Sequence, residues 1–517
     1  MFLAIQTLIK RSEYHDSVTL MLVARELSHM AEVEDAAVVM ATEANIGLLK
    51  NAGLLTPEAE SASPNDLVIA VKGAQVALGN ILVEAEKLLH KKQTESATSE
   101  FRPKTLGGAV KADPGANVAV ISVAGRYAAA EAWEALLHGL HVLLFSDNVS
   151  LEDEIALKRY AVEHGLLLMG PGAGTAILNG VALGFANVVP RGPVGIVAAA
   201  GTGLQEVSSL LAKYGAGLSQ GIGTGGRDLK EEVGGLMMLA GLKALQDDPD
   251  TKVILLVSKP PAASVTSKML EQAGLSKKPT VVCFLGGDTI VPPVSLAQKW
   301  GKTVVVAHTL EQAAMLGAQA AGIHRLPKSK TSEVSSKPHF ATNQRYLRGL
   351  FSGGTLCYEA QVIWRDLLSE PVFSNAPLEA ANQLSDSLHS QGHTVVDLGE
   401  EEFTVGRPHP MIDNDLRIRR LMQEAQDPQA AVIMLDVVLG YGAHPDPASE
   451  LAPAVQKARE LRQAAGGELL VVASVTGTEG DPQGLGRQVS RLEQASVIVC
   501  ESNAAAARLV AEVIKKL

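Results

Sequence analysis

GIVAAAGTGLQE, residues 195–206, is an apolar run that ends at Gly-Thr-Gly and continues with helical spacing. A second run, LRGLFSGGTLCYE at residues 347–359, ends in a similar way. An apolar run that stops at Gly before a helical pattern predicts a buried strand turning sharply into a helix. The chain therefore builds one type of strand-to-helix corner twice.

The segments that follow the two corners also match one another, in the same order. The offset is 153 residues at the corners (201 and 354) and 179 residues at the next pair (248 and 427), which indicates insertions in the second copy. One βαβ-rich domain therefore occurs twice. The further matching pairs are DPDTKVILLV (248–257) with DPQAAVIMLD (427–436), KPTVVCFLGG (278–287) with GELLVVASVTG (467–477), and HTLEQAAMLGAQAAG (308–322) with SNAAAARLVAEVIKK (502–516).

Composition limits the class of protein. At 517 residues the chain is too long for one core and predicts three or four domains. Hydrophobic residues make up 46% and aromatic residues only 4%, which suits packed α/β layers. The net charge of −11 disfavours nucleic acid and anionic membranes as partners. The sequence lacks a membrane-length apolar run and a signal-peptide pattern, so we expect a cytoplasmic protein. The three widely spaced cysteines are expected to be buried, reduced thiols.

The alternation of apolar strands and helical segments predicts the domain boundaries. We expect a small α/β domain at 1–90, a polar linker at 91–115 and a βα domain with a parallel sheet at 116–190. The repeated domains occupy 191–327 and 346–517, joined by a linker at 328–345. Within 116–190, LLLMGP (166–171) predicts a strand and GAGTAILNG (172–180) the helix after it. Ser150 with Asp153 predicts a capping box.

The two corners are candidate anion sites. A strand that ends in Gly-Thr before a helix presents free backbone N–H groups and the positive end of the helix dipole. Each corner is also followed by an acid, Glu206 or Glu359. The alternative is that Gly only permits a tight turn. Neither corner fits the P-loop or GxGxxG pattern. The anion-binding candidates are Gly201, Thr202, Gly203, Gly353, Gly354 and Thr355.

Three further Gly- or Pro-rich turns carry candidates in the first half. GIGTGGRDLKEEVGG (221–235) places Arg227 beside Gly225 and Gly226, where a guanidinium can clamp an oxyanion with two hydrogen bonds. Pairing of Arg227 with Asp228 or Glu231 is the alternative. The remaining substrate-binding candidates in this half are Lys259 in VSKPPA, which is otherwise a solvated lysine, and Gly170 and Gly172, whose turn permits close approach of a ligand to the backbone.

The second half adds a rigid loop, DLGEEEFTVGRPHPMID (397–413), with Arg407 and His409. Prolines on both sides of His409 fix the backbone there, which is unusual for an ordinary surface histidine. Asp436 ends a predicted strand and is a substrate-binding candidate. Neither a tight metal-ligand spacing nor a GxSxG elbow is present, so no metal is expected. Arg227, Arg407 and His409 are the candidate catalytic residues.

Taken together, six motifs closely resemble the FdrA family, over nearly the whole chain. That family looks like a relative of the succinyl-CoA synthetase α subunit. The resemblance implies a Rossmann-like CoA-binding-type domain at 116–190 and flavodoxin-like ligase domains at 191–327 and 346–517. The motifs are LLFSDNVSLEDEIALKRYA, GLLLMGPGAGTAI, GTGGRDLKEEVGGLMML, SKPPA, GGTLCYE and VGRPHPMIDNDLRIRRL.

The chain departs from these relatives at two places. Succinyl-CoA synthetase carries its phosphoryl group on a loop histidine, whereas the corresponding FLGGDTIVPPVSLAQKWG (284–301) contains none. The usual family form of GPGAGTAI has Asp-Cys where this chain has Gly172-Ala173. Without the histidine, a phosphohistidine relay to a nucleotide cannot work in the usual way.

The resemblance implies one subunit of a carbamoyltransferase of the oxamate type, which transfers a carbamoyl group between oxalurate and phosphate in allantoin-derived purine catabolism. Such a reaction needs oxyanion sites and no nucleotide. Two alternatives stay open. One is an NDP-forming acyl-CoA synthetase that binds CoA or a nucleotide, and the other is a non-catalytic scaffold or ligand-sensing subunit. The expected partners are a small anionic substrate and other subunits of a hetero-complex, with a homodimer also open.

Overall fold

The computed structural model describes residues 3–15, 17–28, 30–94, 103–287, 303–324, 339–404 and 407–517. It confirms the α/β class. The chain forms two compact units: the first contains residues 1–114, 122–124 and 399–413, and the second contains 115–121, 125–398 and 414–517. No helix in the described part of the chain is both long and apolar enough to cross a membrane. Cys283, Cys357 and Cys500 are buried and form no disulfide within the described part of the chain, as expected.

The first unit is built around a three-stranded antiparallel sheet with the order β1-β3-β2. Apolar cores lie on both of its faces, one of them beneath α1 and α4. The short helix α5 (Leu106–Ala112), capped by Thr105, lies inside the stretch expected to be only a linker. The other elements are β1 (Leu3–Lys10), α1 (Ser17–Ser28), β2 (Val33–Met40), α2 (Glu43–Asn51), α3 (Pro57–Glu60), β3 (Leu67–Ala74), α4 (Leu78–Thr94) and α14 (Glu401–Thr404).

The second unit begins with a small parallel sheet of order β4-β5-β6. The Ser150 hydroxyl accepts a hydrogen bond from the Asp153 amide (3.0 Å), so the predicted N-cap of α7 is confirmed. The elements are β4 (Val118–Ile121), α6 (Gly125–Leu137), β5 (His141–Leu144), α7 (Leu151–Glu163) and β6 (Leu168–Met169).

A seven-stranded sheet follows, with the order β13-β12-β11-β9-β10-β7-β8. Its last two strands correct the sequence interpretation: GAGTAILNG forms strand β7, not a helix, and β7 and β8 join this sheet although the boundary was expected at 190. The elements are β7 (Thr175–Leu178), β8 (Val181–Gly184), β9 (Arg191–Ala198), α8 (Gly201–Lys213), β10 (Leu218–Gly223), α9 (Leu236–Asp247), β11 (Val253–Ser258), α10 (Ala263–Gly274), β12 (Thr280–Phe284), β13 (Val304–Val306) and α12 (Leu310–Ala320).

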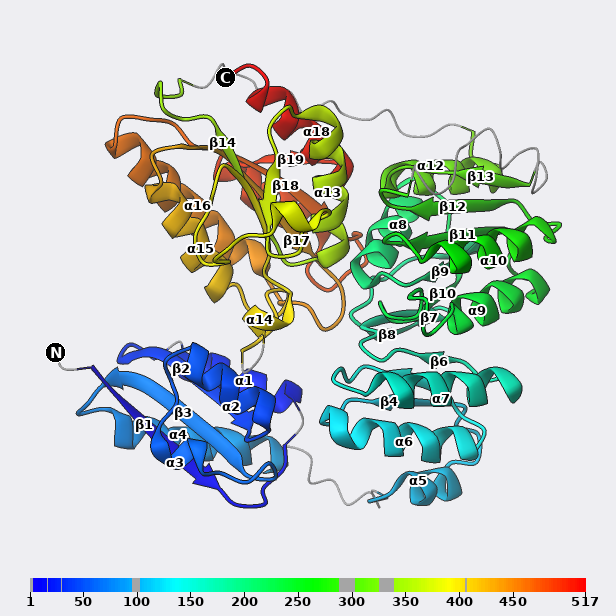
Figure 1. The fold of residues 1–517 in the computed structure, drawn as a ribbon, viewed down its shortest axis with the longest axis horizontal. Helices are drawn as coiled ribbons and strands as arrows, with labels where there is room; N and C mark the ends of the chain where they lie inside the picture. The colour runs from blue at the N-terminus through cyan, green and yellow to red at the C-terminus, as the bar shows by residue number, and fades with distance from the viewer. Residues whose placement is uncertain are drawn as a thin grey trace. The chain divides into compact units, whose positions relative to one another are not determined.

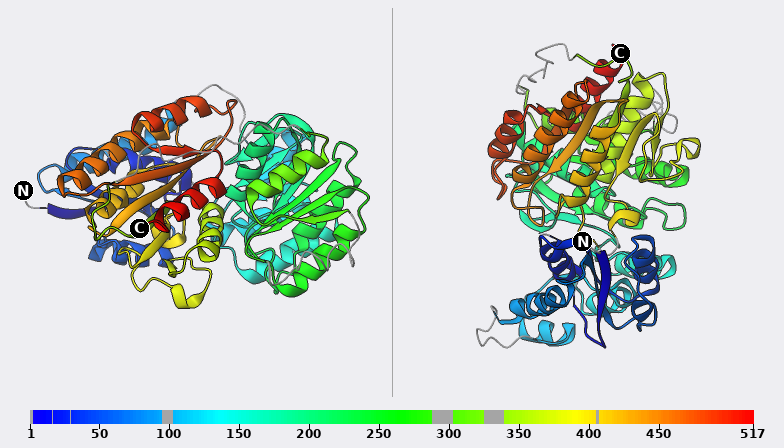
Figure 2. Two further views of the ribbon diagram at one scale, coloured as in Figure 1. Left: turned by 90° about the horizontal axis from the view of Figure 1, so that it is seen from above. Right: turned by 90° about the vertical axis from the view of Figure 1, so that its left-hand side faces the viewer.

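The last sheet has six parallel strands in the order β15-β16-β14-β17-β18-β19. Helices cover both of its faces, with α15 and α16 on one side and α13 and α18 on the other (Figures 1 and 2). The elements are β14 (Tyr346–Phe351), α13 (Gly354–Leu367), β15 (Val372–Ser374), η1 (Ala380–Asn382), β16 (His393–Asp397), α15 (Asp415–Gln426), β17 (Ala430–Val438), α16 (Pro447–Ala464), β18 (Leu470–Thr476), α17 (Leu485–Gln494), β19 (Ile498–Cys500) and α18 (Asn503–Ile514).

The two large sheets confirm the internal repeat. The strands that carry the matched sequence segments occupy corresponding places in the two sheets. The order is β13-β12-β11-β9-β10 in the first sheet and β19-β18-β17-β14-β16 in the second. The second copy carries β15 and η1 before β16, and α14 after it, which accounts for the larger offset. The expected linker at 328–345 lies mostly outside the described residues.

The acids that follow the two corners join the copies. Both are buried, at 2% exposure for Glu206 and 1% for Glu359. Glu206 on α8 accepts hydrogen bonds from the Asn503 amide (3.0 Å) and the Thr476 hydroxyl. Glu359 on α13 accepts them from the Leu310 amide (2.7 Å) and from Asn503 Nδ2 (2.8 Å). Asn503 and Leu310 are the first residues of α18 and α12, so each copy caps a helix of the other.

Burial makes these carboxylates hard to ionise. It raises the pKa of Glu206, and it raises the pKa of Glu359 to about 7, while the hydrogen bonds that each receives oppose the shift. In the unfolded chain a glutamate titrates near 4.5. Between these two values the folded state binds more protons than the unfolded state, so the contribution of Glu359 to stability is full below about pH 4.5 and is lost as pH rises through 7.

We predict that Glu359→Gln weakens the pH dependence of stability. The wild-type protein should lose stability between pH 5 and 8, by about 3 kcal/mol at most from this group. The variant cannot ionise at this position, so its unfolding midpoint in urea should fall less over the same range. Glu512→Gln, on the exposed face of α18, is the matched control and should follow the wild type. Parallel pH profiles for Glu359→Gln and the wild type would contradict the prediction.

Candidate functional site

The two Gly-Thr corners lie against each other. The Thr202 hydroxyl accepts a hydrogen bond from the Thr355 amide (3.3 Å). A Cβ atom added to Gly203 would lie 2.9 Å from Thr355 Cγ2, and one added to Gly353 would lie 2.9 Å from Thr202 Cγ2. Each threonine therefore fits against the glycine of the opposite corner. As a result, the N-termini of α8 and α13 face a common region.

The first corner keeps its backbone donors available. Ala200, the N-cap residue of α8, provides no side-chain acceptor, and the amides of Gly201, Thr202 and Gly203 have no hydrogen-bond partner among the described residues. Gly201 is exposed and Thr202 is half-buried, so a ligand can reach these amides. A helix N-terminus with free N–H groups favours a bound oxyanion. This geometry is the one that the sequence predicted for an anion site.

The second corner is already occupied by a carboxylate of the protein. Asp436, at the end of β17, accepts hydrogen bonds from the amides of Ser352 and Gly353 (2.7 Å each) and from the Ser352 hydroxyl (3.0 Å). Arg417 pairs with the same carboxylate (3.1 Å), and burial lowers the pKa of this arginine. Asp436 is fully buried. It thus satisfies the corner from inside, which corrects its expected role in substrate binding.

Beside Asp436 the second corner carries a further carboxylate and an ammonium group. A Cβ atom added to Gly354 would lie 2.6 Å from Asp397 Oδ2 and 3.7 Å from Lys259 Nζ. Lys259 follows β11 and lies 5.5 Å from the centre of the Tyr358 ring. Burial raises the pKa of the Cys357 thiol well above its usual value, and Asp397 raises it further while Lys259 lowers it. The thiol therefore stays protonated at neutral pH, and Lys259 is the accessible cation of this cluster.

Arg227 is not positioned as an oxyanion clamp. Its Nε pairs with Glu154 (2.8 Å) and its Nη2 donates to the Val149 carbonyl (2.8 Å). Glu154 also pairs with the fully buried Lys158, which in turn pairs with Asp228 (2.8 Å each). Because two arms of the guanidinium are already engaged, Arg227 anchors the Gly-rich turn to α7 rather than presenting a free fork.

The glycines around Arg227 bring two backbone loops together. A Cβ atom on Gly225, whose φ is +84°, would lie 2.5 Å from the Pro171 carbonyl oxygen, and one on Gly170 would lie 2.2 Å from the Leu144 carbonyl oxygen. Only glycine permits such contacts. Gly226 and Gly172 face open space. At Gly225 and Gly170 the close approach is therefore to the protein's own backbone, which explains the glycines without a ligand, and their roles in ligand binding stay predictions.

Arg407 and His409 belong to the first unit, whereas both Gly-Thr corners belong to the second. Arg407 pairs with Asp35 on β2 (2.6 Å), and Asp413 pairs with Arg25 on α1 (3.8 Å). The His409 ring accepts a hydrogen bond from the Met411 amide (3.2 Å). Arg407 is thus engaged with the N-terminal domain through one nitrogen of its guanidinium, and its catalytic role stays a prediction. The catalytic role of His409 stays a prediction.

No group of three or more metal-ligating side chains occurs among the residues that the structure describes.

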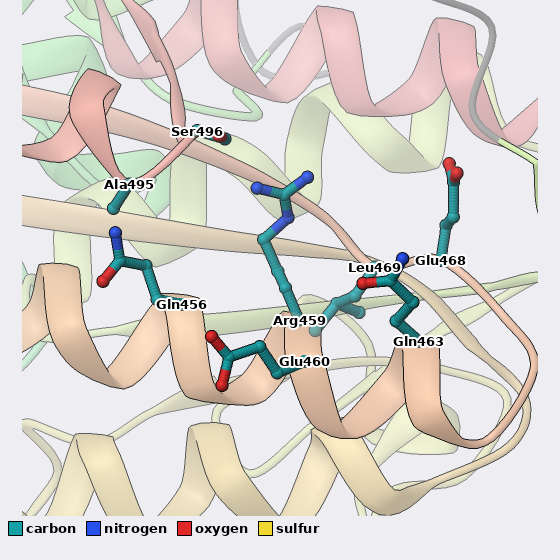
Figure 3. A pocket seen from close by; sticks show the side chains of 8 residues that line it. All are labelled: Gln456, Arg459, Glu460, Gln463, Glu468, Leu469, Ala495 and Ser496. Carbon is teal, nitrogen blue, oxygen red and sulfur yellow. The ribbon is translucent and has the colours of Figure 1, made fainter.

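A cavity of about 380 Å³ lies near the beginning of β18, at the opposite end of the sheet from the corners. Its lining comes from α16 and from the turns before β18 and after α17, with Arg459 extending into it (Figure 3). The lining residues are Gln456, Arg459, Glu460, Gln463, Glu468, Leu469, Ala495 and Ser496. None of them was a candidate from the sequence.

Sequence reasoning missed Asp397 and Arg417. Asp397 is the last residue of β16 in HTVVDLG, and the carboxyl ends of parallel strands are where site residues gather, so its position carried a usable signal. Arg417 lies in an arginine-rich helix, where nothing distinguishes it from Arg419 or Arg420. Only the fold shows which of these arginines reaches Asp436.

Two family models match parts of the chain. The CoA-ligase family matches residues 350–513, and a model described as AllF, heavy metal-associated domain, matches residues 3–104. YahF of Escherichia coli (strain K12) is 44% identical over 99% of each chain. The chain therefore belongs to the FdrA family, as its motifs predicted. The stretch matched by the AllF model contains no cysteine, so soft thiolate ligands for a heavy metal are absent from it.

More distant relatives match only part of their length. Subunit α 1 of the ADP-forming succinate–CoA ligase of Archaeoglobus fulgidus is 30% identical over 35% of this chain and 62% of its own. Among solved structures, the dinucleotide forming acetyl-coenzyme A synthetase 1 of Ca. Korarchaeum cryptofilum (apo form) is 15% identical, with a TM-score of 0.31, and covers 77% of this chain and 83% of that one. The match of the CoA-ligase family model to residues 350–513, not this weak structural likeness, supports the CoA-ligase fold class.

We predict that Gly203→Ala separates the facing corners. The added methyl group meets Thr355 at 2.9 Å and Ala200 Cβ at 3.1 Å, and such overpacking costs about 1–3 kcal/mol. Gly201→Ala is the matched control, because its nearest atom is Thr175 Oγ1 at 3.5 Å, an ordinary contact. Urea unfolding of both variants measures the difference. Equal midpoints for the two variants would show that the corners are not in close contact.

Proposed function

We propose that this chain is a subunit of an acyl-transferring enzyme with the acid–thiol ligase fold, and that it binds the phosphate of an acyl phosphate at the facing corners. The observation that supports this function is the open set of amides at Gly201–Gly203, opposite Thr355. Converging helix N-termini stabilise a phosphate oxyanion as it forms. The CoA-ligase family match, and relatives that are acid–thiol ligases, support the same class of chemistry.

The proposed step is attack of an acceptor on the acyl carbon of the acyl phosphate. The acceptor bonds to the acyl carbon as the bond from that carbon to the phosphate oxygen breaks, and the acceptor's proton passes to the departing phosphate, which leaves as inorganic phosphate. The free amides of α8 and the hydroxyl of Thr202 bind the leaving phosphate. In a ligase the acceptor is the thiol of CoA, and the reaction runs in either direction. No side chain of this chain is covalently modified in this step.

Carbamoyl transfer is the second candidate, with oxamate as the acceptor and oxalurate as the product. Two observations favour it. The region 284–301 contains no histidine to pass a phosphoryl group to a nucleotide. The second observation concerns the small sheet β4-β5-β6. Open α/β sheets bind their ligands in the crevice where the strand order reverses. The described strands of this sheet follow one another without such a reversal, so they form no crevice of this kind for CoA. We expect other subunits to complete the acceptor site.

We predict that Thr202→Val weakens binding of inorganic phosphate. Valine keeps the shape of the side chain but removes the hydroxyl, and loss of a hydrogen bond to a charged ligand costs about 1–3 kcal/mol. Thr202→Ser keeps the hydroxyl and serves as the control, with near wild-type affinity expected. Isothermal titration with phosphate measures both variants. Unchanged affinity in Thr202→Val would remove the first corner from the proposed site.

We predict that the purified complex consumes an acyl phosphate without forming a phosphoenzyme. ³¹P NMR should show phosphate release from carbamoyl phosphate with oxamate, or from acetyl phosphate with CoA, and the productive pair identifies the acceptor. Incubation with labelled ATP and Mg²⁺ should leave the chain unlabelled. Acid-labile label on His409 would instead support a nucleotide-forming ligase. No turnover with either pair would favour a scaffold or ligand-sensing subunit.

A further inference from the structure

Two pairs of opposite charges lie near the facing corners, and only the first pair forms an ion pair. Asp436 is matched by Arg417, and both are buried away from the ligand region. Lys259 and Asp397 form the second pair of opposite charges, and both lie near Gly354: a Cβ atom added there would be 2.6 Å from Asp397 Oδ2 and 3.7 Å from Lys259 Nζ. They come from β11 of the first sheet and β16 of the second, so each copy of the repeat contributes one of them.

Lys259 is available to a ligand. Its ammonium group makes no hydrogen bond or ion pair with any residue that the structure describes, and it lies 5.5 Å from the centre of the Tyr358 ring. Lys259 is half-buried, which keeps the charge at the edge of the site and its stem against the protein. A compact ammonium in this position binds a phosphate oxygen as a point charge.

Asp397 places the opposite charge at the same glycine. Its side chain is 2% exposed, and one of its oxygens lies against Gly354, the first residue of α13. A low effective dielectric lets this charge act on a ligand at short range. A ligand with a second negative group beside its phosphate therefore meets repulsion from Asp397, whereas an uncharged amide meets none.

We infer that Lys259 binds the phosphoryl oxyanion and that Asp397 selects acyl phosphates whose acyl part is uncharged, such as carbamoyl or acetyl, over those that carry a carboxylate. This inference rests on the proposed function, because it assigns the substrate class of the same site. Succinate, the acid named for the ligase of Archaeoglobus fulgidus, forms an acyl phosphate with a free carboxylate, so the inference separates this chain from that relative.

Two phosphonates of nearly the same shape test the selection. Phosphonoacetamide ends in an uncharged amide, and phosphonoacetate ends in a carboxylate. We expect the full chain to bind phosphonoacetamide at least about tenfold more tightly at fixed ionic strength, because one added negative charge faces Asp397. Asp397→Asn should tighten the binding of phosphonoacetate more than that of phosphonoacetamide and so narrow the difference between them. Lys259→Met should weaken both by about tenfold or more.

Lys252→Met is the matched control for Lys259. Lys252 precedes the same strand, β11, at its other end, and donates a hydrogen bond to the Pro249 carbonyl oxygen (2.6 Å), so its removal should change neither affinity.

Equal affinities of the wild type for the two phosphonates would overturn the selection, even where Asp397→Asn fails to fold. Unchanged binding in Lys259→Met would overturn the role of the lysine. If the wild type binds neither phosphonate nor inorganic phosphate, the proposed function fails together with this inference. Binding of inorganic phosphate that depends on Thr202, without discrimination between the phosphonates, overturns the inference alone.

Discussion

The reciprocal capping by Glu206 and Glu359 is the constraint on which the paired domains depend. A buried carboxylate is costly unless it is hydrogen-bonded, and here each acid receives bonds at the start of a helix from the other copy. The positive end of that helix lowers the cost further. Because Asn503 bonds to both acids, the two contacts are not independent. They fix how α8 and α13 meet, and hence how closely the Gly-Thr corners approach.

Duplication alone would give two equivalent corners, but the two corners differ in the residues that surround them. In the second copy, Asp436 and Arg417 fill the corner with an internal ion pair, whereas the first copy has no acid at the corresponding place: β11 ends in Ser258, followed by Lys259. The matched segments DPDTKVILLV and DPQAAVIMLD show the same difference, since the first ends in Val257 and the second in Asp436. One corner therefore keeps its backbone amides open to a ligand, and the other is filled by a carboxylate of the protein. The open amides of one corner are enough to bind a single anion between the two helix N-termini.

The repeat and its corners could be predicted because they rest on local patterns: buried strands, glycine turns and the order of matching segments. The prediction failed where long-range contacts decide. GAGTAILNG reads as a helix start, but β-branched Thr175 and Ile177 extend the neighbouring sheet beside β10. Arg227 looked free because its partner, Glu154, lies on a helix more than seventy residues earlier. Asp436 was found as a site residue, but its orientation toward Ser352 and Gly353 requires the assembled sheet. Pairings between distant residues leave no periodic trace in the sequence.

The same argument accounts for the GRPHP motif, whose rigidity suggested catalysis. Its residues lie in the segment 399–413, which forms one compact unit with the N-terminal domain and is held there by the Arg407–Asp35 pair. This segment begins two residues after Asp397 and ends immediately before Asn414, whose side-chain oxygen accepts a hydrogen bond from Arg417 (2.8 Å), the partner of Asp436. The prolines on both sides of His409 fix the backbone of this segment, and such rigidity serves the packing against the N-terminal domain as well as it would serve catalysis, so the catalytic role of His409 stays a prediction.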